Sequence, residues 1–442
     1  MVKVVKFGGS SLADATQFKK VADIVHGDPD RRFVVPSAPG KRFKDDTKVT
    51  DLLILAYSHH DQKDFDEIFG TMKERYDSII RDLKLDYSLD DEFKVIKEAF
   101  IKQTGFDYAV SRGEYLNGKL LAKYLDFDFI DAKDVIRIDP KGNYDAKRTD
   151  SLLKKELAKH EYAVIPGFYG MRNDGSDNIQ AFSRGGSDVT GSIVAKCGKA
   201  DLYENWTDVS GFLIADPRII KNPQVIETIT YKELRELSYM GASVLHENSI
   251  FPVRSEGIPI NVKNTNRPQD PGTLIVESTC HKPQHVITGL AGKKGFATVM
   301  IEKDMMNSEI GFGRKVLQVF EQHGMSFEHM PSGIDTMTII VNTKEFIAQE
   351  QDIIAGLHRA VHPDYIDLES DLALIAVVGR GMKASRGTAA RVFKALASEN
   401  INIKMIDQGS SELNIIIGVR NCYFEQALKA IYNEFINEED SH

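Results

Sequence analysis

Short apolar runs alternate with amphipathic segments over roughly the first 280 residues. The runs VKVVKF, RRFVVP, FDFIDA, YAVIPGFYG and ADLYENWTD predict strands. The segments between them, such as SSLADATQFKKVADIV and TDLLILAYSHH, predict helices because their apolar residues recur at helical spacing. Alternating strands and helices are typical of an α/β domain with a mainly parallel sheet covered by helices on both faces.

Residues 61–104 depart from this alternation, because they are charged, helical in pattern and broken only by Gly70. This segment predicts a helical hairpin inserted into the first domain. Residues 264–284 are rich in Pro, Asn and Thr, which indicates a boundary. We therefore expect the first domain to cover residues 1–282.

The region after this boundary contains an internal repeat, found when the chain is shifted by 76 positions against itself. ATVMIEK then falls on ALIAVVG, MSFEHM on INIKMI, and TIIV on NIII. Each copy predicts a strand, a glycine-bearing loop, a helix, two strands and a final helix. We expect two small α/β modules, the first covering 295–370 and the second combining 284–294 with 371–442.

Composition narrows the class of protein. At about 150 residues per domain, 442 residues predict about three domains. The net charge of −9 argues against a nucleic acid or an anionic membrane as the main partner. The three cysteines lie far apart and form no CxxC pair, which fits a reducing compartment. No apolar run approaches the ~18 residues of a membrane helix, so we expect a soluble, cytoplasmic protein.

The first strand runs directly into a glycine pair, in the stretch KFGGSS. Gly8 and Gly9 remove side chains where backbone N–H groups and a helix N-terminus face outward, which suits an anion. Lys6 precedes the pair, so phosphate is the favoured ligand. Taken alone, the motif is explained equally well by a tight turn beside a solvated lysine.

A second glycine pair opens another predicted helix, in the stretch QAFSRGGSDVTG. Arg184 precedes this pair and can hold a carboxylate through two hydrogen bonds. The alternative is a capped helix with a surface ion pair. Two further stretches, SRGE and ENWTDVSGFLIADPR, are individually explained as a helix start with a simple cap and as a plain loop.

Taken in order, KFGGSS, SAPG, TDLL, RGE, SRGGSD, WTDVSG, DPR and GASVLH resemble the aspartokinase family of the amino-acid kinase superfamily. The paired trailing modules resemble ACT domains. The resemblance spans practically the whole chain except the helical insertion. It implies an α/β amino-acid kinase fold followed by two ferredoxin-like ACT domains. The implied activity is ATP- and Mg²⁺-dependent phosphorylation of the side-chain carboxylate of L-aspartate to 4-phospho-L-aspartate, the first step of lysine, threonine and methionine biosynthesis.

The resemblance also implies roles for individual residues. Lys6 would balance charge on the transferring phosphoryl group, and Asp188 would orient that lysine. The other implied ATP contacts are Phe7, Gly8, Gly9, Ser10, Thr207, Asp208 and Arg218. Arg184 would bind the α-carboxylate of aspartate and Glu114 its ammonium. The remaining implied substrate residues are Ser37, Thr50, Gly185, Gly186 and Ser187, with alignment on TDLL favouring Thr50 over Thr47.

Two positions depart from the family pattern. Ser243 stands where many relatives have a lysine, and Leu213 stands where a tyrosine is common. One cation near the nucleotide is therefore missing, and the adenine contacts are less defined than the phosphate contacts.

The ACT resemblance implies feedback inhibition by an amino acid at the first module. The implied effector residues are Met306, Ser326, Phe327 and Glu328. Lysine is the leading effector because Glu328 could receive its ammonium, and threonine stays open. Modules that only dimerise are the alternative, and a homodimer or dimer of dimers is expected either way.

Two other functions remain to be separated from this one. A glutamate-type kinase on the same fold would prefer a different acceptor. A decayed amino-acid sensor would have no use for a lysine that neutralises phosphate, so the retention of Lys6, Arg184 and Asp188 favours an enzyme.

Overall fold

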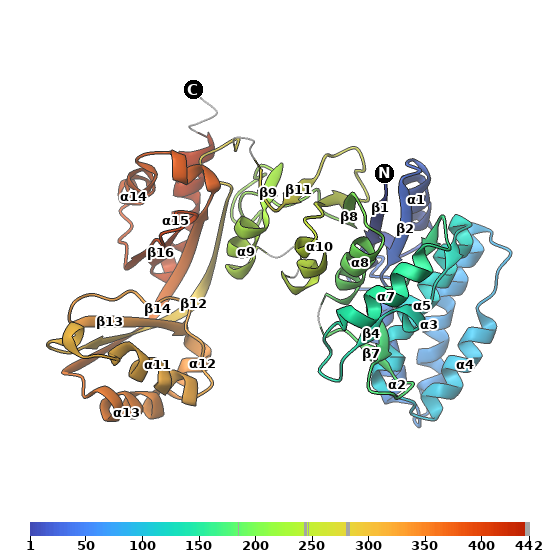
Figure 1. Ribbon diagram of the computed structural model, residues 1–442, viewed down its shortest axis with the longest axis horizontal. Helices are drawn as coiled ribbons and strands as arrows, with labels where there is room; N and C mark the ends of the chain where they lie inside the picture. Colours follow the sequence, from blue (N-terminus) through green and yellow to red (C-terminus); the bar gives the residue numbers. More distant parts are fainter. Residues whose placement is uncertain (184, 243–244, 246, 280–282, 438–442) are drawn as a thin grey trace. The chain divides into compact units, whose positions relative to one another are not determined.

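The computed structural model describes residues 1–183, 185–242, 245, 247–279 and 283–437. The chain forms two compact units, and Figure 1 follows it from one end to the other. Unit 1 comprises Met1–Phe212, Val225–Tyr231 and Val244–Thr279. Unit 2 comprises Leu213–Gln224, Lys232–Ser243 and Cys280–His442.

Unit 1 is built on an eight-stranded sheet with the order β3-β5-β2-β1-β8-β10-β11-β9. Its neighbouring strands are parallel except for the β10–β11 pair. The strands are β1 (Lys3–Phe7), β2 (Arg31–Pro36), β3 (Asp128–Phe129), β5 (Ala163–Val164), β8 (Leu202–Thr207), β9 (Thr228–Thr230), β10 (Ile260–Asn264) and β11 (Thr273–Val276). The predicted mainly parallel α/β sheet is confirmed.

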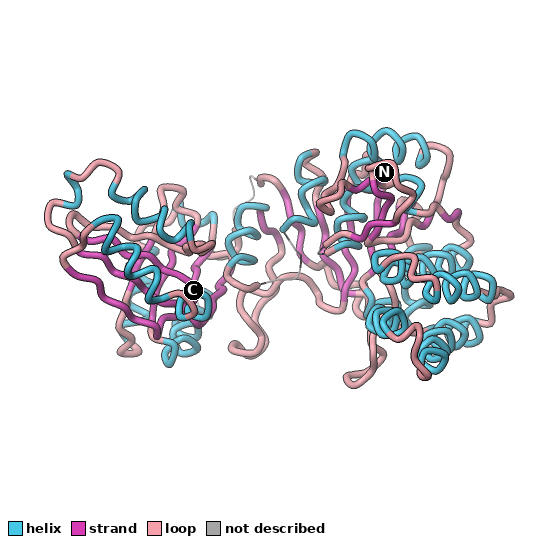
Figure 2. The backbone as a smooth tube through the Cα atoms, turned by 90° about the horizontal axis from the view of Figure 1, so that it is seen from below, coloured by secondary structure: helices cyan, strands magenta, loops and turns pink. Residues whose placement is uncertain are grey.

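Helices lie on either side of these strands (Figure 2). They are α1 (Ala15–His26), α2 (Val49–Ser58), α3 (Phe65–Leu83), α4 (Asp90–Ile101), α5 (Phe106–Leu125), α6 (Ala132–Val135), α7 (Ala146–Leu157), α8 (Gly186–Cys197) and α10 (Phe251–Ser255), with the 3-10 helices η1 (Gly9–Leu12) and η2 (Glu247–Ile250). A small three-stranded sheet contains β4 (Arg137–Ile138), β6 (Tyr169–Arg172) and β7 (Ile179–Ala181).

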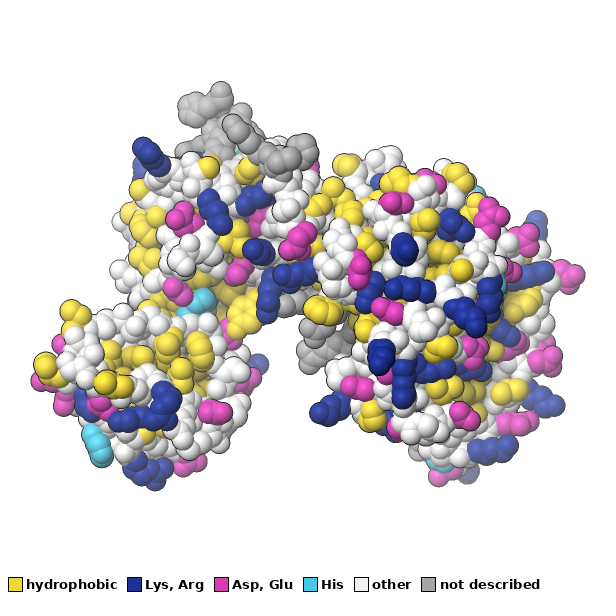
Figure 3. Space-filling model, viewed as in Figure 1, with side chains coloured by type: hydrophobic (Ala, Val, Ile, Leu, Met, Phe, Trp, Pro, Cys, Tyr) yellow, Lys and Arg dark blue, Asp and Glu magenta, His cyan; other side chains and the backbone are white. Residues whose placement is uncertain are grey.

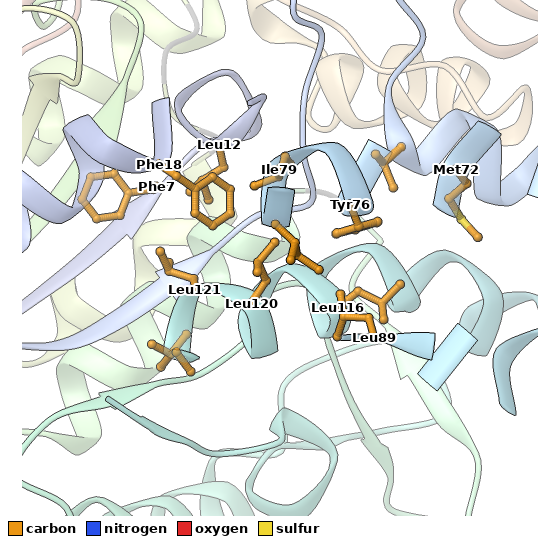
Figure 4. Packing of buried hydrophobic residues seen from close by; sticks show 14 of the residues in the cluster. Phe7, Leu12, Phe18, Met72, Tyr76, Ile79, Leu89, Leu116, Leu120 and Leu121 are labelled. Atoms are coloured by element: carbon orange, nitrogen blue, oxygen red, sulfur yellow. The ribbon is translucent and has the colours of Figure 1, made fainter. Parts of the chain in front are cut away.

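The segment predicted as a helical hairpin forms α3 and α4. Both helices bury one apolar stripe, because Phe69, Met72, Tyr76 and Ile79 recur at helical spacing on α3. Figure 4 shows Met72, Tyr76 and Ile79 packed with residues of β1, η1, α1 and α5. The insertion therefore shares the core of the sheet domain.

Unit 2 contains a five-stranded antiparallel sheet with the order β13-β12-β14-β16-β15. The strands are β12 (Gly289–Glu302), β13 (Thr336–Asn342), β14 (Tyr365–Val378), β15 (Met405–Asp407) and β16 (Asn414–Val419). The helices are α9 (Tyr231–Tyr239), α11 (Phe312–Gln322), α12 (Thr343–Ile347), α13 (Glu350–Val361), α14 (Thr388–Ser398) and α15 (Phe424–Tyr432), with the short helical turns η3 (Met306–Ser308), η4 (Arg380–Ala384), η5 (Asn421–Tyr423) and η6 (Asn433–Asn437).

The two long strands of this sheet serve both sequence repeats. One half of β12 pairs with β13, and the other half pairs with the part of β14 that also pairs with β16. The repeats therefore form one continuous sheet, since β12 and β14 are 14 residues long each.

The surface is mixed in charge, with basic and acidic side chains interspersed over the face that Figure 3 shows. Within the described ranges, no helix combines the length and apolar character needed to cross a membrane.

Candidate functional site

Three neighbouring strands of unit 1 end at one edge of the sheet. β1 lies between β2 and β8 and is parallel to both, so the carboxyl ends of all three meet there. In open α/β sheets such an edge is the usual place for a ligand. The motifs KFGGSS, SAPG and WTD follow these three strand ends, and the fold therefore brings them together.

Lys6 lies at this edge, is 8% exposed, and carries its ammonium next to a carboxylate. Its Nζ lies 2.7 Å from Oδ1 of Asp188, in the first turn of α8. Asn205 stands opposite Lys6 in the β1–β8 register and donates from Nδ2 to the same oxygen over 2.8 Å. The predicted Lys6–Asp188 pair is thus formed, and Asn205 is a third member that the motif search missed although it lies within ENWTD.

The first glycine turn passes directly beside this ammonium. A Cβ on Gly8 would meet no atom closer than 3.6 Å, and the Nζ of Lys6 would be 3.7 Å away. The N–H of Gly8, predicted to face a phosphate, instead donates to the carbonyl of Trp206 over 3.0 Å. Gly9 and Ser10 open η1, where the first N–H groups of a helix have no acceptor within it.

Gly9 has no room for a side chain, because it lies against the backbone of the SAPG turn. A Cβ on Gly9 would lie 2.8 Å from the carbonyl oxygen of Ala38. Gly40 donates its N–H to the carbonyl of Gly9 over 2.8 Å. The side chain of Phe7 is fully buried, so only its backbone reaches this edge, and its carbonyl accepts the N–H of Ser37.

The second glycine pair forms the start of α8. Gly185 caps the helix at φ 57°, a left-handed conformation that favours glycine. A Cβ on Gly186 would lie 2.3 Å from the ring of Phe168, and Ser187 packs against Gly167. The predicted carboxylate ligand Arg184 lies outside the described residues.

Glu114 lies in the interior of α5, so the explanation of SRGE as a helix start with a simple cap is wrong. The helix passes close to the SAPG turn because residue 113 is glycine, where a Cβ would lie 2.8 Å from that of Ala38. Glu114 is 6% exposed and its Oε2 has no hydrogen-bond partner. Burial raises the pKa of Glu114 to about 8, and the N–H of Ala38 offsets this only in part.

Asn117 follows Glu114 one helical turn later and faces the same turn of the chain. Its Nδ2 donates to the carbonyl of Ser37 over 2.7 Å, while its buried Oδ1 has no partner. Two buried acceptors without donors on one helix face suit a ligand that carries several N–H groups. Thr50, predicted to contact the substrate, lies half-buried in the first turn of α2.

The predicted nucleotide contacts outside the glycine turn do not lie together in one unit. Thr207 ends β8, and its Oγ1 donates to Asp208 over 3.2 Å. Arg218 belongs to unit 2, where it is 86% exposed and pairs with Asp216 through Nη2 at 2.6 Å. Ser243, one of the two departures from the family pattern, is outside the described residues.

The predicted effector residues lie in unit 2. Met306 is buried at the start of η3, whereas Ser326 and Phe327 are exposed. Glu328 accepts a hydrogen bond from the hydroxyl of Tyr239 at the end of α9, which together with burial raises the pKa of that phenol to about 12. The sequence repeat could not indicate this contact, because Tyr239 lies outside it.

Comparisons with known proteins agree with this geometry. Residues 1–264 match the amino acid kinase family, and residues 375–435 match an ACT domain. The chain is 40% identical to aspartokinase 3 of Bacillus subtilis over 98% of both chains. It is 29% identical to chloroplastic aspartokinase 1 of Arabidopsis thaliana, over 99% of this chain and 80% of that one.

Solved structures give the same result. The crystal structure of Clostridium acetobutylicum aspartate kinase has 50% identity and a TM-score of 0.89, over 98% of this chain and 99% of that one. Two structures of E. coli aspartokinase III, one with aspartate and ADP and one with lysine and aspartate, share the fold at 24% identity, with TM-scores of 0.74 and 0.73 and the same coverage.

Unit 1 thus defines an amino acid kinase, with a glycine-rich turn and a carboxylate-paired lysine at the carboxyl edge of the sheet. The chain belongs to the aspartokinase family and is an aspartate kinase with an ACT regulatory region. The aspartokinase family and the aspartate kinase class of enzyme, both predicted from the ordered motifs, are confirmed.

Proposed function

We propose that this enzyme transfers the γ-phosphoryl group of ATP to the side-chain carboxylate of L-aspartate, giving 4-phospho-L-aspartate. The observation that carries the proposal is the buried Lys6 ammonium, held by Asp188 beside the backbone of Gly8. ADP and aspartate in the E. coli aspartokinase III structure support the same substrates here.

The chemistry needs cations more than it needs a base. The acceptor carboxylate is ionised at neutral pH and the donor phosphate is anionic. Two like charges at 4 Å repel by about 4 kcal/mol at an effective dielectric of about 20. Lys6 offsets this repulsion as charge moves across the transferring group, and catalysis reduces to positioning and charge neutralisation.

The position of Asp188 fits this role for Lys6. Its Oδ1 accepts from both Lys6 and Asn205, so the ammonium is held in place before a nucleotide binds. The ammonium keeps two further N–H donors for phosphate oxygens, because an ammonium has three. The N–H groups at the start of η1 supply neutral donors beside it.

Glu114 and Asn117 are proposed to receive the α-ammonium of aspartate. Both carry a buried oxygen without a donor, and both face the turn that contains Ser37. Arg184 is assigned the α-carboxylate from its motif alone. This arrangement selects an amino acid over a simple dicarboxylate.

Mg²⁺ is proposed to arrive with the nucleotide, held by phosphate oxygens and water rather than by a protein cage. Among the described residues, no group of three or more His, Cys, Asp or Glu side chains could hold a metal ion. The ion would supply charge neutralisation to the phosphates.

Lysine is proposed as the feedback inhibitor, with threonine as the second candidate. Glu328 would receive the side-chain ammonium of lysine, at the cost of its hydrogen bond from Tyr239. Lysine bound to E. coli aspartokinase III supports this choice. A dimer through the first ACT module is also proposed, since Met305, Ile310 and Ile334 are exposed there.

Trapping the product with hydroxylamine tests the reaction. Enzyme, MgATP and aspartate should give aspartyl hydroxamate, whereas glutamate in place of aspartate should give little. Equal or better use of glutamate, or ADP release without hydroxamate, would refute the proposed acceptor. Inhibition curves with lysine and threonine, singly and together, test the effector.

A further inference from the structure

A buried arginine of the helical insertion reaches the proposed site. Arg75 lies on α3, is 4% exposed, and directs its guanidinium away from its own helix. The guanidinium donates to the carbonyls of Gly40 and Ala13 over 2.5 and 3.4 Å. It also lies 2.7 Å from Oδ2 of Asp46. The turn after η1 and the loop after β2 therefore meet at one cation on α3.

These acceptors belong to the two parts of the site that must be aligned. Ala13 directly follows η1, the helical turn that begins at the first glycine pair. Gly40 is in backbone contact with Gly9. Asp46 lies in the loop that leads from the SAPG turn to Thr50 at the start of α2.

Asp46 closes this loop on itself through a second arginine. Arg42 donates from its backbone N–H and from Nε to Oδ2, and from Nη2 to Oδ1, each over 2.9 Å. These bonds are internal to the loop, so they shape it without fixing it to the sheet. Arg75 supplies the link between Asp46 and the core.

The position of Arg75 is itself fixed by packing. Its neighbour Tyr76 is fully buried and donates its hydroxyl to the carbonyl of Gly113 over 2.8 Å, directly before Glu114. Figure 4 shows Tyr76, Met72 and Ile79 packed into the core that includes Leu12 and Leu116. The guanidinium is therefore carried by a helix whose position is fixed by the core.

The first glycine turn, residues 8–12, is called the phosphate turn below, and it has contacts to the core besides Arg75. Gly8 donates to Trp206, and Ser11 Oγ lies 2.7 Å from Oγ1 of Thr265. Lys6 is held by Asp188. The loop over residues 41–48 has its link to the core through Asp46, so loss of Arg75 should disturb this loop more than the phosphate turn.

We infer that Arg75 is a positioning residue for aspartate binding, which fixes the loop between Ser37 and Thr50 against the phosphate turn. The inference rests on the proposed assignment of this loop to the substrate. It gives the helical insertion a role in the reaction, because α3 supplies a guanidinium that bonds both to the turn after η1 and to the loop after β2.

The test compares Arg75→Ala with Arg81→Ala, a change on the same helix at a 64% exposed side chain. Arg75→Ala should raise KM for aspartate about tenfold or more while KM for ATP changes less than about threefold, because small misplacements of a substrate residue are costly. Arg81→Ala should leave both constants unchanged. A similar rise in both KM values together with a fall in kcat would overturn the inference. So would an unchanged KM for aspartate in a folded Arg75→Ala variant.

Chemical rescue separates positioning from general stability. A cavity of about 640 Å³ lined by Arg42, Asp46, Arg75 and Arg81 lies beside the guanidinium and would admit a small cation. Guanidinium ion at millimolar concentration should lower KM for aspartate of Arg75→Ala, with no effect on wild type. A gain in melting temperature without recovery of KM would count against the inference.

A second variant keeps the test open if Arg75→Ala does not fold. Asp46→Asn preserves volume while it weakens both arginine contacts, and it should raise KM for aspartate severalfold. An unchanged KM there would refute the inference. Formation of aspartyl hydroxamate by the wild-type enzyme is scored separately, so failure of the proposed reaction cannot be confused with failure of the Arg75 role.

Discussion

Aspartate binding should depend on pH through Glu114. Burial raises the pKa of this carboxyl to about 8 in the free enzyme. A ligand ammonium needs the ionised form, because only a carboxylate offers the charge and acceptors that an ammonium lacks. Binding of aspartate near neutral pH must therefore release a proton from Glu114.

The size of the effect follows from the ionised fraction. With a pKa near 8, about one-tenth of Glu114 is ionised at pH 7 and about one-half at pH 8. KM for aspartate should then fall about fivefold from pH 7 to pH 8, and about tenfold from pH 6 to pH 7. Glu114→Gln removes this titration, so its KM should be higher and almost independent of pH over this range.

The assay is ADP release at saturating MgATP, with aspartate varied at each pH in buffers of constant ionic strength. KM for ATP serves as the control, since no role in nucleotide binding is proposed for Glu114. A wild-type KM for aspartate that stays constant from pH 6 to pH 8 would refute the reasoning. So would a Glu114→Gln variant that keeps the wild-type pH dependence.

The raised pKa of Glu114 also predicts how the stability of the fold depends on pH. The pKa of Glu114 is higher in the folded state than in the unfolded state. Its contribution to the free energy of unfolding is therefore fully present below pH 4.5 and is lost as the pH rises towards 8. The loss amounts to about 5 kcal/mol at about 1.4 kcal/mol per pKa unit. Glu114→Gln should therefore melt higher than wild type at pH 8, by a margin that shrinks towards pH 5. Equal melting temperatures at both pH values would contradict this.

Four other substitutions test the site and its regulation. Lys6→Ala should lower kcat about 100-fold or more with an unchanged circular dichroism spectrum, and a near-normal rate in the hydroxamate assay would exclude its role. Gly8→Ala should fold normally but lose activity, whereas Gly9→Ala should lose about 1–3 kcal/mol in urea unfolding because its Cβ meets a backbone carbonyl at 2.8 Å. Tyr239→Phe frees Glu328, so half-inhibition by lysine should need severalfold less lysine; an unchanged inhibition curve would remove Tyr239 from the effector site.

The parallel sheet was predictable because its central strands are buried on both faces. In β1 and β2, adjacent residues such as Val4 and Val5 or Val34 and Val35 are apolar and fully buried, which is the pattern of a strand covered on both faces. The repeat likewise predicted two similar modules. It could not predict that β12 and β14 continue from one module into the other, because a strand of 14 residues and two shorter strands have the same local pattern.

The chemistry of the site was predictable where a motif places it next to a strand end. Lys6 and Asp188 meet because β1 and α8 converge at the carboxyl edge. Arg75 gave no such signal, since a charged residue within a helical pattern ordinarily faces water. Its burial depends on Asp46, Gly40 and Ala13, which only the fold brings to it.

Arg75 and Glu114 are both buried ionisable side chains, but only Arg75 has a partner of opposite charge within the chain. Arg75 has its carboxylate partner within the chain, so that pair is complete before any ligand binds. Glu114 lacks a donor on Oε2 and is left uncharged near neutral pH by its burial. A buried carboxylate with one unpartnered oxygen is costly, and we expect the ammonium of the substrate to supply the missing donor. The burial that raises the pKa of Glu114 would also strengthen its pairing with an ammonium, because water no longer screens the two charges. The free enzyme is therefore less stable than it could be, and the difference is recovered in part when the substrate binds.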